Sequence, residues 1–141
     1  MNYGRAAVAA LVATLIYYMC GFFTEGWLFR GDFAPYTAVY RSSDTVMRYM
    51  PLGIVFSFVG TFVVAMVYAR LSRESNRVIE GLRLGALIGV FVACAFAGTN
   101  YVVLNIGGKL AIEEAAGSFV QWTLVGIVIG LLYRPLSAAV R

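Results

Sequence analysis

Four apolar runs, each at least 18 residues long and without a charged side chain, dominate the sequence; they cover 6–23, 51–69, 84–106 and 116–133. A membrane-spanning helix needs about 20 such residues, and in lipid the backbone must satisfy its own hydrogen bonds. The chain is 61% hydrophobic and 13% charged, against about 45–50% and about 25% in soluble domains. The pattern predicts one all-α domain, an integral membrane four-helix bundle over residues 1–141, and excludes a soluble enzyme or a disordered segment.

The first run begins directly after Arg5, so a signal peptide is the competing interpretation. No small-x-small cleavage site follows the run. The sequence YYMC is also a poor lipoprotein acceptor. We therefore expect this run to be a retained helix.

Basic residues in the short loops predict the orientation, because cytoplasmic loops carry an excess of Lys and Arg. Four spans place both termini on one side, and that side holds seven of the eleven basic residues: Arg5, Arg70, Arg73, Arg77, Arg83, Arg134 and Arg141. The opposite side holds Arg30, Arg41, Arg48 and Lys109. We expect both termini in the cytoplasm of a bacterial inner membrane, and we interpret the net charge of +4 as a topology signal.

The sequence has no histidine and two cysteines, Cys20 and Cys94, which form no C-x-x-C pair. Histidine is the commonest metal ligand and the usual proton carrier near neutral pH. C-x-x-C pairs carry thiol redox chemistry and many metal sites. We therefore expect free thiols, no cofactor and no metal, which argues against quinone-linked thiol oxidoreductases.

Small residues recur every four positions, and such faces let helix backbones approach closely in lipid. The helix-packing positions that we predict are Gly53 and Ser57 in the second run, Gly81, Gly85 and Gly89 leading into the third, and Gly126 and Gly130 in the fourth. Thr61, Ala65 and Ala69 extend the second set, and Ala93 and Ala97 extend the third. Because a short loop joins the second and third runs, we expect these two helices to form an antiparallel pair through these faces.

Polar residues within the runs lie mostly toward the outer side. They are Tyr17 or Tyr18, Ser57, Thr99, Asn100, Gln121 and Trp122. Asn and Gln are costly in hydrocarbon unless hydrogen-bonded, so they should face the bundle interior. The simpler interpretation is bonding between helices, and Trp122 also suits an interfacial anchor. The alternative is an outward-open polar pocket for a lipid or small ligand.

The first outer loop, Thr24 to Met50, mixes aromatic and charged residues, as is typical of a segment at the headgroup level. We expect Pro35 to break it and a short interfacial helix to run from Tyr36 to Tyr49. An outer location argues against nucleic acid as a partner. The acidic residues on this side are expected to be solvated loop groups: Glu25, Asp32, Asp44, Glu113 and Glu114.

The chain resembles a group of small, uncharacterised bacterial four-helix membrane proteins. The resemblance rests on the aromatic-rich first loop, on AMVYAR closing the second run, on EGLRLGALIGVF opening the third and on GIVIGLLYRP closing the fourth. It implies a four-span topology in the bacterial inner membrane and no particular activity. Glutathione-type four-helix transferases differ, because their arginine, histidine and glutamate signature is absent here.

Three functions remain open from the sequence. The first is an interaction or assembly subunit that contacts membrane lipids and either a second copy or a partner membrane protein. The second is a lipid or small-ligand binding or transport component that uses the outer polar pocket. The third is an enzyme acting on a lipid, with Glu25, Asp32 or Glu113 as acid–base groups; we expect no enzyme.

Overall fold

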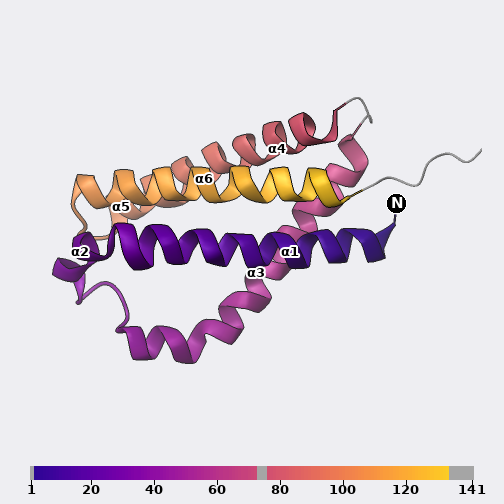
Figure 1. Ribbon diagram of the computed structural model, residues 1–141. Helices are drawn as coiled ribbons and strands as arrows, with labels where there is room; N and C mark the ends of the chain where they lie inside the picture. Colours follow the sequence, from indigo (N-terminus) through magenta and orange to yellow (C-terminus); the bar gives the residue numbers. More distant parts are fainter. Residues whose placement is uncertain (1, 73–75, 134–141) are drawn as a thin grey trace, which may run out of the picture.

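The computed structural model describes residues 2–72 and 76–133, and every regular element in these two ranges is a helix (Figure 1). Three arginines of the orientation count, Arg73, Arg134 and Arg141, lie outside the described residues. The architecture is therefore all-α over the described chain, as the sequence predicts.

Four helical segments are long and apolar enough to cross a membrane. They are α1 (Tyr3–Gly21) continued by η1 (Phe22–Leu28), α3 (Ser43–Leu71), α4 (Arg77–Val92) continued by η3 (Ala93–Gly98) and α5 (Thr99–Val103), and α6 (Gly108–Leu132). The helices begin before the apolar runs, because backbone hydrogen bonding continues through charged residues that water can solvate. Asn2 and Asn76 cap α1 and α4 by accepting hydrogen bonds from Arg5 N at 3.1 Å and Ile79 N at 3.3 Å.

A short segment that we call the strap (residues 29–42) connects η1 to α3 and contains α2 (Arg30–Phe33) and η2 (Ala34–Tyr36). The separate helix expected from Tyr36 to Tyr49 is not observed. Turns follow η2, and Ser43 already begins α3, which continues through Pro51 without a break. The strap packs Phe33, Tyr36, Val39 and Tyr40 against Ile106, Leu110 and Ala111, which holds its aromatic side chains against the start of α6.

The helix α6 lies between α1 and α4 and contacts both along much of its length (Figure 1). The closest approach is between α4 and α6, where three glycines of α4 face Gly126, Gly130 and the Phe119–Thr123 backbone. A Cβ added to Gly85 would lie 2.5 Å from the carbonyl oxygen of Trp122, and one added to Gly126 would lie 2.6 Å from the Cα of Gly85. Only glycine permits this backbone contact.

The helix α3 crosses α1 at a buried threonine pair. The hydroxyl oxygens of Thr14 and Thr61 lie 2.8 Å apart, and both hydroxyls also donate to the carbonyl oxygen of Ala10. The small residues of α3 thus pack against the small residues of α1.

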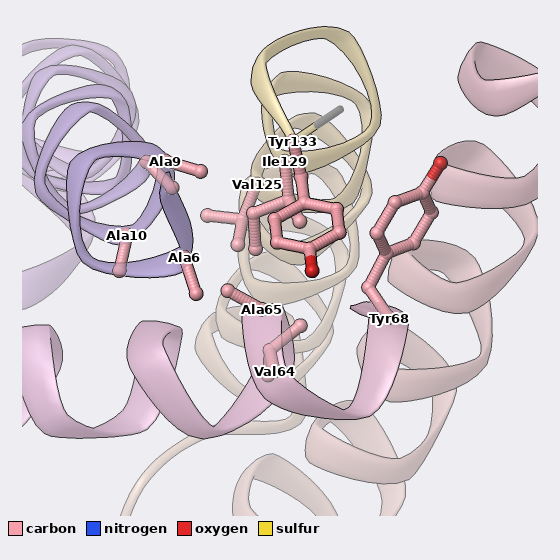
Figure 2. Packing of buried hydrophobic residues seen from close by; sticks show 10 residues of the cluster. Ala6, Ala9, Ala10, Val64, Ala65, Tyr68, Val125, Ile129 and Tyr133 are labelled. Carbon is pink, nitrogen blue, oxygen red and sulfur yellow. The ribbon is translucent and has the colours of Figure 1, made fainter. Parts of the chain in front are cut away.

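The hydrophobic core lies at the end of the bundle opposite the strap (Figure 2). Alanines of α1 face Val125 and Ile129 of α6 and Val64 and Ala65 of α3, while the rings of Tyr68 and Tyr133 meet edge-on at 6.1 Å. The hydroxyl of Tyr68 donates to the carbonyl oxygen of Arg77 at 3.0 Å. This bond fixes the end of α3 against the start of α4.

The expected antiparallel pairing of α3 with α4 through their small faces is wrong. The glycine face of α4 packs on α6, and the Thr61–Ala65 face of α3 packs on α1. A short loop sets the order of two helices but not their contact face. The α6 backbone at Gly126 and Gly130 matches the glycines of α4, whereas the alanines of α1 match the slightly larger residues of α3.

The first half of α3 (residues 43–57) stands away from the other helices (Figure 1). No residue between 43 and 60 is buried, and the buried residues of α3 begin at Thr61. The bundle is therefore closed at the core end and splayed at the strap end.

Candidate functional site

Three of the six predicted pocket residues meet between α1 and α6. The Gln121 side chain is 4% exposed, and its Nε2 donates to the carbonyl oxygen of Tyr17 at 3.3 Å. The rings of Tyr17 and Trp122 lie 5.7 Å apart. Within the described ranges, the other carboxamide atom, Gln121 Oε1, has no hydrogen-bond partner. A buried oxygen of this kind can accept a hydrogen bond from a hydroxyl or amine.

Ser57 joins the same region through Tyr18, the alternative that the sequence left open. Its hydroxyl donates to Tyr18 Oη at 3.3 Å, and a Cβ on Gly53 would lie 2.8 Å from that Oη. Tyr17 and Tyr18 meet edge-on at 5.7 Å. Four side chains from three helices therefore form one aromatic and hydroxyl cluster, at the point where α1 and α3 begin to diverge.

Thr99 and Asn100 do not join this cluster. They lie on α5, which packs on η3 and α6, whereas Tyr17 lies on α1 beyond α6. Thr99 is exposed and Asn100 is half-buried. The depth estimate placed all six residues in the same half of the bundle, but depth carries no information on which side of α6 a residue lies.

Gly21 is a further residue of this region that sequence reasoning missed. A Cβ at this position would lie 2.6 Å from Gln121 Nε2. The absent side chain makes room for the carboxamide beside α1. Nothing in the sequence distinguishes this glycine from the other helical glycines.

A second polar group ties the strap to the start of α6. The hydroxyl of Tyr40 donates to Glu114 Oε1 at 2.5 Å, and the amide of Gly107 donates to Tyr36 Oη at 2.8 Å. Lys109 Nζ lies 2.6 Å from Asp32 Oδ1 and 3.5 Å from Glu113 Oε1. The expectation of solvated loop acids is wrong for Glu113, because it lies within α6 and its side chain is only 14% exposed.

The environment of Tyr40 opposes its ionisation. Burial raises the pKa of the phenol first, and the hydrogen bond to Glu114 raises it further, because that bond needs the phenolic proton. The negative charges of Glu114 and Glu25 act in the same direction. Tyr40 therefore stays a neutral donor to a carboxylate at every physiological pH.

The donor groups of the described chain do not gather into a metal site. No group of three His, Cys, Asp or Glu side chains in residues 2–72 and 76–133 is arranged to hold a metal ion. Cys20 is half-buried, Cys94 is exposed, and both are free thiols.

Two shallow hollows lie at the ends of the bundle. One, of 370 Å³, is formed by the strap and the 105–107 segment before α6, and Tyr36 and Asn105 contribute its polar side chains. The other, of 320 Å³, lies at the opposite end beside Gly4, Arg5, Val8 and Leu132. Neither is lined by the aromatic and hydroxyl cluster, so an outward-open pocket there stays a prediction.

No family model, curated protein or solved structure matches the chain. The resemblance drawn from the sequence therefore stays a prediction.

Proposed function

We propose that this chain is a multi-pass protein of the bacterial inner membrane that acts as an assembly subunit, associating with a second copy or with a partner membrane protein. Four helices long and apolar enough to cross a membrane support the multi-pass character. The excess of basic residues on one side supports cytoplasmic termini, with the strap on the outer side.

The observation that carries the assembly role is the first half of α3. The glycine faces of α4 and α6 are occupied by each other, so they offer nothing to a partner. Residues 43–57 instead present apolar side chains on several sides with no helix of the same chain against them. In lipid, association of helices depends on packing that the surrounding acyl chains do not supply, and this half-helix is free to provide it.

The experiment is to count copies in native lipid. The protein is extracted with its surrounding membrane by a styrene–maleic acid polymer and analysed by native mass spectrometry. We expect a discrete homo-oligomer or a fixed-ratio complex. Leu52→Ala combined with Phe56→Ala should weaken it, whereas Leu87→Ala, on an equally exposed face of α4, should not. A monomer without partner at every protein-to-lipid ratio would contradict the assembly role.

A second candidate, binding of a lipid or small polar ligand, is favoured by one observation. Gln121 Oε1 is buried without a partner in the described chain, beside Tyr17 and Trp122. The same native spectra would report a bound molecule of defined mass. Its loss on Gln121→Leu, but not on Asn100→Leu beyond α6, would support binding at this cluster. Retention in both variants, with changed thermal stability alone, would exclude it.

A further inference from the structure

The charged side chains at the strap end are unevenly compensated. Lys109 bridges Asp32 and Glu113, Glu114 accepts from Tyr40, and the Arg41 guanidinium lies 4.3 Å above the Tyr49 ring. Glu25 on η1 and Arg48 on α3 are both exposed, and neither forms an ion pair with any described residue. These two opposite charges are left without a direct partner.

Both charges lie on apolar, exposed helix surfaces. Glu25 is surrounded along η1 by Phe22 and Trp27, which are 76% and 67% exposed, and Arg48 follows Met47, which is 66% exposed. An ionised group on a membrane-facing surface is costly unless an opposite charge meets it. Each of these surfaces is therefore incomplete in a single copy.

The two charges have matching depth but are separated within one chain. Glu25 lies three residues before the end of η1 and Arg48 five residues after the start of α3, so their depths differ by about 3 Å at 1.5 Å per residue. The helices that carry them diverge beyond the Tyr18–Ser57 contact (Figure 1). A second copy can supply what the divergence prevents.

Two other charges nearby need no such partner. Asp44, one turn before Arg48, lies in the first turn of α3, where the helix dipole favours a negative charge. Arg30 lies in the strap beyond the end of η1, where water solvates it.

We infer that two copies of this chain pair about a two-fold axis, the first half of α3 of each packing against η1 of the other, with Arg48 facing Glu25 of the second copy. Two-fold symmetry makes the contact twice. Phe22 and Trp27 supply aromatic surface of the kind that carries binding energy at the centre of interfaces. This inference rests on the proposed assembly function and names its partner as a second copy.

Charge reversal tests the pairing. Glu25→Lys and Arg48→Glu, each alone, should raise the dimer dissociation constant in lipid vesicles at least tenfold, measured by energy transfer between labelled copies. The combined variant restores the opposite charges and should recover most of the affinity. Arg41→Glu makes the same change on the same side of the membrane but at a residue already stacked on Tyr49, and it should leave the constant within about twofold. Single variants without effect, or a combined variant as weak as either single one, would overturn the interface.

Cross-linking provides a readout that does not depend on charge. Differently tagged copies carrying Glu25→Cys and Arg48→Cys, both in a Cys20→Ser, Cys94→Ser background, should form a mixed disulfide on mild oxidation. A dimer of the wild-type protein with no mixed disulfide would reject this interface and leave self-assembly intact. A wild-type protein that stays monomeric in vesicles would reject both the interface and self-association.

Discussion

The hydroxyl oxygens of Thr14 and Thr61 lie 2.8 Å apart where α1 crosses α3, and both hydroxyls donate to the carbonyl oxygen of Ala10. This crossing is the last point at which α3 is buried before its first half leaves the bundle. The attachment of α3 therefore depends on a few small, polar contacts.

Replacing Thr61 by the nearly isosteric valine should destabilise the folded state by about 0.6 to 1.7 kcal/mol, the range found for hydrogen bonds between membrane helices. Thr14 keeps its bond to Ala10, so no buried hydroxyl is left unpaired. Unfolding in mixed micelles measures the change, and a double-mutant cycle with Thr14→Val isolates the pair. Fully additive effects of the two substitutions would show that the hydroxyls do not interact.

Gly85→Ala should destabilise the α4–α6 contact by about 1–3 kcal/mol, as overpacking of a close contact does. The added methyl group would lie 2.5 Å from the carbonyl oxygen of Trp122, and a backbone atom cannot move aside as a side chain can. The same unfolding assay measures the loss. Gly98→Ala is the matched control in the same helical segment, because the nearest atom to its Cβ is 3.7 Å away. Equal effects at the two positions would contradict the proximity of α4 and α6.

Tyr40 should ionise well above the ordinary tyrosine pKa of about 10, because burial and its bond to Glu114 both favour the neutral phenol. A group whose pKa is higher in the folded than in the unfolded state stabilises the fold below the unfolded pKa. That contribution disappears as the pH rises through the folded pKa. The stability difference between wild type and Tyr40→Phe should thus be constant below about pH 10 and shrink above it.

Ultraviolet titration of phenolate in the folded protein measures this directly. Tyr40→Phe should remove one late-titrating group, and Glu114→Gln should shift that group downward by removing a negative charge and a charged acceptor. An unchanged late phase in Tyr40→Phe would be inconsistent with the assignment.

The amide of Gly107 should exchange slowly with solvent deuterium, because it donates to Tyr36 Oη at 2.8 Å. Tyr36→Phe should speed that exchange about three- to tenfold, equivalent to the ~0.5–1.5 kcal/mol of a single hydrogen bond. Tyr49→Phe is the control, since Tyr49 contacts Arg41 through its ring. Equally fast exchange in all three proteins would show that the strap does not protect this amide.

The helices follow from the sequence, because length and apolarity alone dictate them. Their pairing does not. The glycines of α4 form a smooth face that fits any equally smooth face, and only the three-dimensional arrangement selects Gly126 and Gly130 over Ser57 and Thr61.

The candidate site was predictable in part for the same reason. Gln121 and Tyr17 are correctly placed near one another by depth, but Asn100 shares their depth and lies on the other side of α6. The strap was misjudged because the contacts of Tyr36 and Tyr40 join residues about 70 positions apart in the chain, a separation over which local patterns carry no signal.

The position of α6 also bears on the order in which the molecule assembles during synthesis. Chains emerge from their N-terminus, so α1, α3 and α4 enter the membrane before α6. The partner of α4 and half of the contacts of α1 are then still missing. Until α6 arrives, the glycine face of α4 is open to any neighbouring helix, and insertion of this last helix is the step that commits the chain to its native pairing.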